Sequence, residues 1–447
     1  MNRSAAARKA GGPAFDARLR RSLRICMVHY SDFHVDSRIQ RQARALAERG
    51  DEVDLVCLST PGEERAGPGV IRIHSLGEDK AAGGAGSYLR GYAGFLVRAL
   101  RVVASLDKRR PFDLVEAHNM PDVLVFAALR PKLRGTPVIL NVHDTFPELF
   151  ATKFNRPIDG PWAGLIRAQE RISSRFADAV VTVTPEAGEI LERRGSAPRG
   201  VNVVMNSPDE TVFGPPRPPA PFPAEGPIRV IYHGGLAPRF GVELLIEAMG
   251  LLSPAADRLK LRICGTGSDQ ARIARLAEGS APGRVLVAST PVPFREIPGE
   301  LMEAHLGVVP TLKDDFTQLL LPVKLLEYAH MGLPAVAPRL PVIERYFSDA
   351  ELAFFEPGSA ASLARAIEET CGEPGLARER AERAAERLKE IAWPVQRRTY
   401  LRLVDELVDA KTNGGAKRVG VGRKSKALQA VHSREPRTNS RPSTPIA

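Results

Sequence analysis

The sequence contains little cysteine, and its four cysteines stand far apart. They are Cys26, Cys57, Cys264 and Cys371. Their spacing is not that of a zinc-binding motif, and a disulfide framework needs a short, cysteine-dense chain. Three of them fall inside apolar runs, where a thiol behaves as a small buried hydrophobe. This usage favours a reducing, cytoplasmic compartment.

A long hydrophobic run is also missing. No uncharged apolar stretch approaches the ~20 residues that a membrane-spanning helix needs. The first residues are basic, but no apolar segment follows them, so we expect no secretory signal. At 447 residues, of which 43% are hydrophobic, the chain exceeds what one core usually accommodates and can fill two.

The net charge of +11 is concentrated at the two ends of the chain. Residues 1–24 contain seven Lys or Arg and one Asp, and residues 411–447 contain nine and one Glu. The segment between them therefore carries a net charge of −3. We expect residues 1–21 and 411–447 to be disordered basic extensions, and the nearly neutral body argues against specific nucleic-acid binding.

Strand-like apolar runs alternate with helix-like segments along the body, which is typical of parallel α/β sheets. A proline-rich segment interrupts this alternation, and such segments act as semi-rigid spacers. We therefore expect two Rossmann-like, doubly wound domains that face a cleft. The predicted parts are the basic extension (1–21), the first domain (22–213), the linker (214–227), the second domain (228–391), a terminal helix (392–410) and the basic tail (411–447).

One stretch of the second domain predicts a helix that starts beside a ligand. A strand at residues 306–309 is followed by a polar loop and then by Leu-Leu-Leu-Pro-Val-Lys-Leu-Leu-Glu-Tyr from residue 319. Pro322 suits the first turn of a helix, and Gly332 suits its end. The loop follows a strand of a parallel sheet, so the unpaired N–H groups near Leu320 and Leu321 are placed to hold an anion such as a diphosphate.

Within this predicted helix, Lys324 and Glu327 are three residues apart and share a face. A surface ion pair worth a few tenths of a kcal/mol would give the same pattern. We favour a binding role because the helix ends, the loop and the residue types agree.

This run resembles the donor-site signature of the family 4 retaining glycosyltransferases, which have the two-domain GT-B fold. The resemblance covers residues 23–408 and implies that Glu327 binds the ribose of a nucleotide-sugar. Many members carry a second glutamate eight residues earlier, where this chain has Leu319. Family members also cross back to the first domain with a C-terminal helix, which residues 392–410 match.

The resemblance implies transfer of a sugar from a nucleotide-diphosphate-sugar to an acceptor, with retention of the anomeric configuration. No Asp-x-Asp pattern follows an apolar strand, so we expect no metal and no cofactor other than the donor substrate.

The second domain opens with a strand and a glycine turn, Gly234-Gly235, which predicts a phosphate cradle. In the family, an arginine or lysine of this loop binds the donor diphosphate, and Arg239 matches it. Phe240 stands where a lysine is common, so we expect Lys324 to supply the second charge.

A second glycine turn follows the strand predicted at residues 259–264. Glycines let a backbone approach a base or ribose closely, so Gly265 and Gly267 are predicted to lie beside the donor nucleoside.

In the first domain, the strand at residues 113–118 ends in His118. The resemblance implies that this histidine contacts the transferred sugar at the reaction centre. The alternative is a structural histidine that caps the following helix. Ligands bind at the carboxyl edge of α/β sheets, which favours the catalytic role.

Two further groups of polar residues follow neighbouring strands of this domain. We expect them to contact the acceptor, although helix capping by Asp36 would equally explain the first group. They are His29, Asp36, Arg38, His143 and Asp144.

Residues 87–106 predict an amphipathic helix with arginines at 90, 98 and 101. Such a helix can lie on an anionic membrane, or it can pack on the sheet with its arginines in water. Related enzymes often act on lipid-linked acceptors, so a glycan or lipid-linked precursor of polysaccharide or cell-envelope synthesis is the expected acceptor. Peripheral contact with the inner face of the membrane would fit this role.

Two other functions remain open from the sequence. A nucleotide-sugar epimerase of similar double-Rossmann shape would need no acceptor. A non-catalytic protein could bind anionic polymers or membranes through its basic ends. The neutral body favours the enzyme.

Overall fold

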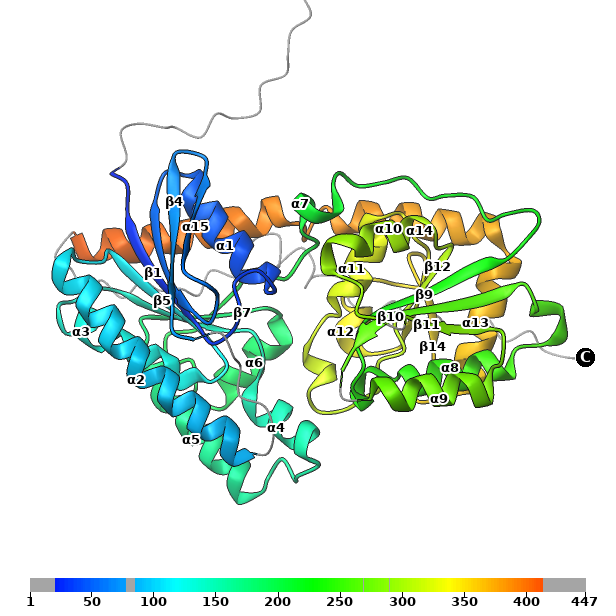
Figure 1. Cartoon of the computed structure of the whole chain (residues 1–447), viewed down its shortest axis with the longest axis horizontal. Helices are drawn as coiled ribbons and strands as arrows, with labels where there is room; N and C mark the ends of the chain where they lie inside the picture. The colour runs from blue at the N-terminus through cyan, green and yellow to red at the C-terminus, as the bar shows by residue number, and fades with distance from the viewer. Residues whose placement is uncertain (1–20, 78–84, 268, 289, 413–447) are drawn as a thin grey trace, which may run out of the picture.

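The computed structural model describes residues 21–77, 85–267, 269–288 and 290–412. The predicted N-terminal extension, except Arg21, and the predicted tail from residue 413 onward lie outside these ranges. The described residues form two lobes side by side, each built on one β-sheet (Figure 1).

The first lobe is built on an eight-stranded sheet in the order β3-β4-β2-β1-β5-β6-β7-β8. All neighbouring strands are parallel except β3, which pairs antiparallel with β4. The strands are β1 (Arg24–His29), β2 (Glu52–Cys57), β3 (Gly62–Ala66), β4 (Gly69–Ser75), β5 (Leu114–His118), β6 (Val138–Val142), β7 (Ala179–Thr182) and β8 (Val201–Val203).

Helices cover both faces of this sheet. One face packs against α1 and the C-terminal helix α15 (Trp393–Thr412), and the other packs against α2 and the segments that follow it. The helices of this lobe are α1 (Ser37–Glu48), α2 (Ala85–Arg109), the 3₁₀ helix η1 (Asp122–Ala128), α3 (Leu129–Leu133), α4 (Phe146–Phe154), α5 (Pro161–Phe176), α6 (Pro185–Arg193) and α7 (Glu210–Phe213).

The second lobe has a six-stranded parallel sheet in the order β11-β10-β9-β12-β13-β14. Its strands are β9 (Ile228–Gly235), β10 (Leu259–Thr266), β11 (Val285–Val287), β12 (Leu306–Val308), β13 (Ala335–Pro338) and β14 (Ala353–Phe355). Its helices are η2 (Pro238–Phe240), α8 (Val242–Leu251), η3 (Pro254–Ala256), α9 (Gln270–Ser280), η4 (Phe294–Glu296), α10 (Ile297–Met302), η5 (Thr317–Leu319), α11 (Val323–His330), α12 (Pro341–Glu344), α13 (Ala360–Gly372) and α14 (Pro374–Leu388).

Two doubly wound parallel sheets confirm the predicted fold class. The central strands read as apolar runs because both of their faces are covered; β1, for example, is buried at every position. Helix α1 starts where its capping residue predicts, since the Asp36 carboxylate accepts a hydrogen bond from the backbone N–H of Arg38.

Three elements escape sequence reasoning. Strand β3 reads Gly-Glu-Glu-Arg-Ala and lies at the sheet edge, so it has no apolar face to reveal it. Strand β4 pairs with both β2 and β3 and extends the sheet beyond the expected first βαβ unit. The third is helix α4, which follows β6 and which the sequence pattern did not mark.

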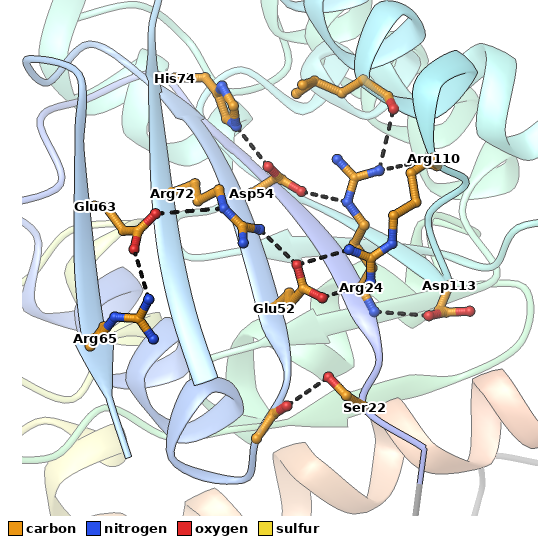
Figure 2. Close-up of polar contacts among 12 residues, drawn as sticks. Ser22, Arg24, Glu52, Asp54, Glu63, Arg65, Arg72, His74, Arg110 and Asp113 are labelled. Atoms are coloured by element: carbon orange, nitrogen blue, oxygen red, sulfur yellow. Dashed lines mark hydrogen bonds and ion pairs between the residues drawn. The ribbon is translucent and has the colours of Figure 1, made fainter. Parts of the chain in front are cut away.

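Charged side chains on and beside strands β1, β2, β3 and β4 are paired with one another (Figure 2). The Asp54 carboxylate contacts the Arg24 guanidinium at 2.8 Å and the His74 imidazole at 2.7 Å. The Glu52 carboxylate forms two ion pairs, one with Arg72 at 2.7 Å and one with Arg110 at 2.6 Å. The Arg24–Asp54 pair is buried, whereas Glu52, Arg72 and Arg110 are partly exposed. These contacts pair the charges of the strands with one another and so explain polar positions without a ligand.

The C-terminal helix α15 runs along the first lobe (Figure 1) and packs against α1 and β5. Residues 214–227, which contain neither helix nor strand, join the lobes. None of the helices in the described ranges is long and apolar enough to cross a bilayer.

Candidate active site

A cavity of about 380 Å³ lies between the lobes, at the carboxyl edge of both sheets. This edge is where open α/β sheets bind ligands, because the loops after the strands can vary without disturbing the core. Of the residues predicted from sequence, the cavity lining brings together Arg38, His143 and Asp144 of the first lobe with Gly234, Gly235, Leu320, Leu321, Lys324 and Glu327 of the second.

The other predicted residues lie near the cavity but not on its lining. They are His29, Asp36, His118, Arg239, Gly265 and Gly267.

The glycine turn after β9 is shaped around Lys324. Gly234 has φ +124°, and a Cβ there would lie 3.1 Å from the Lys324 ammonium nitrogen. The ammonium donates to the Tyr232 hydroxyl at 3.2 Å, and that hydroxyl donates to the Gly235 carbonyl at 2.6 Å. Glycine at 234 therefore lets the lysine of one loop lie against the backbone of another.

Both predicted cations of this lobe lie over one aromatic ring, that of Phe240. The Arg239 guanidinium carbon is 4.7 Å from the ring centre, and the Lys324 ammonium nitrogen is 5.0 Å from it. Such cation–π contacts hold a charge without neutralising it, unlike a carboxylate. The phenylalanine at the usual lysine position thus brings together two cations that are 85 residues apart in sequence.

Burial lowers the pKa of both cations. The Lys324 pKa falls to about 8, although Glu327 acts in the opposite direction. The Arg239 pKa is also lowered by burial, with Asp144 and Asp314 opposing. The Arg239 Nε atom is buried and has no hydrogen-bond partner among the described residues. Buried donors of this kind are expected to gain an anionic partner.

The carboxyl of Glu327 is buried beside His233, whose Nε2 lies 3.2 Å away. Burial raises the Glu327 pKa to about 7, with Lys324 opposing, and burial lowers the His233 pKa to about 3. His233 is therefore neutral at physiological pH. Glu327 can ionise there and accept hydrogen bonds from a bound hydroxyl group.

The start of α11 faces this group of side chains. Pro322 lies at the N-cap, with no side chain capping the helix. Leu320, Leu321 and Lys324 around this start all line the cavity. The sequence predicted this helix with Pro322 in its first turn and Gly332 at its end. In the structure α11 spans Val323–His330, so Pro322 lies one residue before it and Gly332 two residues after it.

The second pair of glycines, Gly265 and Gly267, packs against the backbone of Gly234 and Leu236. A Cβ at Gly265 would lie 2.3 Å from the Gly234 carbonyl oxygen, and one at Gly267 would lie 2.7 Å from the Leu236 carbonyl oxygen. These glycines allow the ends of β9 and β10 to approach each other closely.

In the first lobe, two histidine rings lie edge to edge in nearly parallel planes. His118 and His143 have ring centres 5.2 Å apart with an interplanar angle of 13°. The His118 Nδ1 atom lies 2.9 Å from the His143 Nε2 atom. His118 is fully buried, whereas His143 lines the cavity. The structure thus places the predicted catalytic histidine one ring behind the cavity and the predicted acceptor histidine at it.

The polar turn after β1 is a connected network. Asp36 accepts two hydrogen bonds from the Arg38 guanidinium, at 3.0 and 2.9 Å, and lies 3.4 Å from His29 Nε2. Burial opposes ionisation of Asp36, but Arg38 and His29 hold its pKa well below the usual range. Asp36 therefore both caps α1 and orients Arg38 at the cavity.

Sequence reasoning missed three residues that shape the site, Thr184, Tyr232 and His233. It noted Phe240 only as the absence of a cation and not as the ring that contacts Arg239 and Lys324. Thr184 donates a hydrogen bond from its hydroxyl to the Leu319 carbonyl, which links the two lobes beside the cavity. The position of His233 at the carboxyl end of a central strand was a usable signal, because the same position drew attention to His118.

No group of three or more His, Cys, Asp or Glu side chains is arranged to hold a metal ion in the part of the chain that the structure describes.

Solved structures with two Rossmann-like domains around one cleft share this architecture, and they are GT-B glycosyltransferases. Sucrose-phosphate synthase from Thermosynechococcus elongatus has a TM-score of 0.68 at 17% identity, over 87% of this chain and 100% of its own. Anabaena HepE in complex with UDP-glucose has a TM-score of 0.62 at 12% identity, and the match covers 86% of this chain and 100% of that one. The α,α-trehalose 6-phosphate synthase from Burkholderia multivorans has 0.60 at 15%, over 88% and 98%. At these identities the likeness concerns the fold.

The sequence itself carries the family assignment. Residues 35–207 match the family described as glycosyl transferase 4-like domain, and residues 227–372 match the glycosyl transferases group 1. A comparison with curated protein sequences gives no match. The chain therefore belongs to the family 4 glycosyltransferases and has the GT-B fold.

Proposed function

We propose that this glycosyltransferase moves a sugar from a nucleoside-diphosphate-sugar to an acceptor hydroxyl, with retention of the anomeric configuration. The convergence of Arg239 and Lys324 on Phe240, beside the Gly234–Gly235 turn, is the observation that carries the proposal. Two partly buried cations that aromatic rings hold in place suit a ligand that carries two or more negative charges.

The second lobe binds the donor in this proposal. Arg239, Lys324, the Gly235 N–H and the start of α11 surround the diphosphate. Negative charge develops on the diphosphate as the bond from its oxygen to the anomeric carbon breaks. Fixed cations in a water-poor site stabilise such charge without reorganising, and this is usually the largest contribution to catalysis.

Glu327 holds the ribose of the donor through its hydroxyl groups. The buried carboxyl has His233 on one side, and the neutral imidazole leaves the carboxyl free to ionise. Gly265 and Gly267 leave room near the nucleoside because neither carries a side chain.

The acceptor enters from the first lobe, beside Arg38, Asp144 and His143. The acceptor hydroxyl attacks the anomeric carbon from the side on which the diphosphate leaves, and its proton passes to the departing phosphate oxygen. His143 contacts a sugar hydroxyl and His118 supports it from behind. The protein's own cations balance the charge, so the reaction proceeds without an added metal.

The test is a donor panel with matched variants. We expect UDP- or GDP-sugars to raise the melting temperature, since a ligand that binds only the folded state stabilises it by mass action. Arg239→Ala and Lys324→Ala should abolish this shift, whereas Lys313→Ala, on an exposed lysine of the loop before α11, should retain it. Equal shifts in all four proteins would overturn the donor site.

Product analysis tests the chemistry. The ¹H coupling constant of the transferred sugar's anomeric proton should report the same configuration as in the donor. Addition of EDTA should leave the rate within about twofold. Inversion, or a strict metal requirement, would contradict the mechanism. Release of an isomerised sugar without acceptor would instead support an epimerase.

A surface on the first lobe also supports membrane contact. The helices α2, α3 and α5 contain ten Lys or Arg and only two acids, Asp107 and Glu170, both fully buried. The same helices expose large apolar side chains, namely Leu89, Val97, Leu129, Leu133, Trp162, Leu165 and Ile172.

These helices are neighbours, because α2 contacts α3 and both α2 and α5 pack against η1 (Figure 1). Exposed apolar groups set among cations fit the surface of an anionic bilayer. We propose that the enzyme works on a glycan precursor or lipid-linked acceptor at the inner face of the cytoplasmic membrane, held there by this basic face.

Vesicle binding tests this surface. We expect the protein to sediment with phosphatidylglycerol vesicles more than with phosphatidylcholine vesicles, and less at high salt. Trp162→Ala and Arg98→Glu should each weaken binding, whereas Arg383→Glu on α14 should not. If deletion of residues 1–21 and 413–447 removes all binding, the basic ends and not this face are responsible.

A further inference from the structure

A line of buried polar side chains leads from the cavity through the first sheet to helix α15. It starts at His143 on the cavity lining and continues to His118, with 2.9 Å between their ring nitrogens. The second ring nitrogen of His118, Nε2, lies 3.8 Å from Glu116 Oε1. Glu116 Oε2 accepts a hydrogen bond of 2.6 Å from the hydroxyl of Tyr400.

None of the last three residues reaches solvent, since His118, Glu116 and Tyr400 are all 0% exposed. A carboxyl in the middle of a sheet costs free energy that an apolar side chain would avoid. The donor site does not account for it either, because Glu116 lies in the other lobe, behind both histidines. Its position therefore points to an effect on those histidines.

The step from Glu116 to His118 is electrostatic, because His118 Nε2 faces Glu116 Oε1 at 3.8 Å and has no hydrogen-bond partner among the described residues. Glu116 Oε1 already accepts from the Asn141 side-chain amide at 2.8 Å, and Oε2 accepts from Tyr400. An ionised Glu116 attracts a proton to the facing His118 Nε2. The neutral ring then has a bare Nδ1, which must accept from an N–H at His143 Nε2.

His143 is neutral as well, because burial lowers its pKa. With its proton on Nε2, its Nδ1 carries the lone pair. This atom is buried and has no hydrogen-bond partner among the described residues. It is thus the nitrogen left to accept a hydrogen bond from a ligand.

We propose that Glu116 and Tyr400 are positioning residues that act through His118. Together they hold His143 in the tautomer whose Nδ1 accepts a hydrogen bond from a hydroxyl group of the sugar substrate. The identity of that substrate rests on the proposed function, but the tautomer does not. Helix α15, which follows the second domain in sequence, thereby sets the chemistry of a histidine in the first.

The state of Glu116 makes this arrangement sensitive to pH. Burial raises its pKa to about 7, while the hydrogen bonds from Tyr400 and Asn141 act in the opposite direction. Loss of the Tyr400 hydroxyl should therefore raise the pKa further, and a protonated Glu116 no longer favours a proton at His118 Nε2. The neighbouring Gln42, which accepts from Asn141 at 3.3 Å, is uncharged.

Two charged groups act on Tyr400 from α1 and the residues after it. Arg49 and Asp51 affect the Tyr400 pKa in opposite directions. Arg49 also pairs with Asp405 of α15 at 2.7 Å. Asp405→Asn removes this contact of the same helix and leaves the side chains of Glu116 and Tyr400 in place, so it is the matched control.

The direct test is ¹⁵N NMR of the ligand-free protein with labelled histidine, in which protonated and bare ring nitrogens differ in chemical shift. His143 is assigned by comparison with His143→Gln. We expect a protonated Nε2 and a bare Nδ1 in the parent and in Asp405→Asn. Glu116→Gln and Tyr400→Phe should give mixed tautomers. Parent-like signals in both would overturn the proposal.

Activity gives an independent readout. At saturating donor, Glu116→Gln should lower kcat by roughly ten- to a hundredfold, the scale expected for a misplaced reacting group, with little change in the donor KM. Tyr400→Phe preserves the packing of the ring, and it should move the acidic limb of the kcat profile to higher pH. If Asp405→Asn lowers kcat as much as the other two substitutions do, Glu116 and Tyr400 would merely hold helix α15 in place, which would contradict the proposal.

The two readouts also separate this proposal from the proposed function. If the enzyme transfers no sugar, the NMR result still decides whether Glu116 and Tyr400 set the tautomer. If the enzyme transfers sugar and the tautomer is insensitive, the positioning role alone fails.

Discussion

The ammonium nitrogen of Lys324 lies 3.2 Å from the hydroxyl oxygen of Tyr232 and 4.3 Å from the centre of its ring. No carboxylate in the described ranges comes within ion-pair distance of this lysine. A partly buried charge held mainly by aromatic groups has lost water, and the attraction of Glu327 compensates this loss only in part. The site is therefore built around a charge that its ligand must balance.

We therefore expect Lys324 to lower the stability of the ligand-free protein while it increases the affinity for the ligand. Because burial lowers the Lys324 pKa to about 8, the folded state releases a proton that the unfolded state keeps up to higher pH. The charged lysine thus destabilises the ligand-free fold at pH 7, and Lys324→Met should stabilise it by about 1–2 kcal/mol. Melting curves with and without UDP measure both effects. Without UDP, Lys324→Met should melt at a higher temperature than the parent, and addition of UDP should not raise its melting temperature further.

The control is Lys313→Met in the preceding loop, where the lysine is exposed. It should change neither the melting temperature nor the UDP response. If Lys324→Met melts below the parent, the lysine contributes more to packing than its charge costs.

Donor binding should have an optimum between about pH 7 and pH 8. Glu327, whose pKa burial raises to about 7, must ionise to accept ribose hydroxyls, so affinity rises as pH increases through this value. Lys324 loses its proton near pH 8, so affinity falls above it. Calorimetric titration with UDP from pH 5.5 to 9.5 measures the profile.

Each of two single substitutions should remove one side of this pH profile of UDP affinity. Glu327→Gln should flatten the acidic limb, and Lys324→Arg the alkaline limb, since arginine stays protonated. A flat profile in the parent would show that neither group titrates at the ligand.

Phe240 should matter although it carries no charge. Its ring lies within 5.0 Å of both Arg239 and Lys324, and a cation–π contact contributes on the order of 0.5–2 kcal/mol. Phe240→Leu should weaken UDP binding by roughly tenfold while Phe240→Tyr stays close to the parent. Equal affinities in all three proteins would mean that the backbone, and not the ring, positions the cations.

The turn after η2 predicts a stability difference between two glycines with the same backbone conformation. Gly241 has φ +67°, and a Cβ there would lie 1.9 Å from the Pro310 carbonyl oxygen. Gly283 has φ +70° and open space around it. Gly283→Ala should cost about 1 kcal/mol from the left-handed conformation alone, and Gly241→Ala considerably more.

Urea unfolding of both variants measures this difference. Similar midpoints would show that the loop carrying Pro310 moves away easily. The pair is useful because Gly241 lies between Phe240 and α8, so strain there should also reduce UDP binding.

The sequence predicted which second-lobe residues come together at the cavity because they are close in sequence or follow glycine turns; their role in binding the donor stays a prediction. Lys324 and Glu327 share one helix, and Arg239 follows Gly234 and Gly235 within a few residues. Local spacing therefore fixes most of their geometry. The acceptor half was harder to predict, since its residues come from separate strands.

The two histidines illustrate this limit. His118 and His143 each follow a buried strand, and the sequence marks both. Which ring faces the cavity depends on how β5 and β6 pair and on the path of the loop after each. Only the folded sheet orders them, with His143 in front.

The sequence by itself determined the two parallel α/β domains, the helix that begins near residue 322 and the residue types of the donor site, because these follow from periodicity and local backbone rules. Only the tertiary structure decided that Phe240 holds two cations, that His233 accompanies Glu327, and that Tyr400 reaches Glu116. The contacts of Phe240 with Lys324, of His233 with Glu327 and of Tyr400 with Glu116 join residues far apart in the chain. Such contacts depend on how strands pair and helices pack, not on any local pattern.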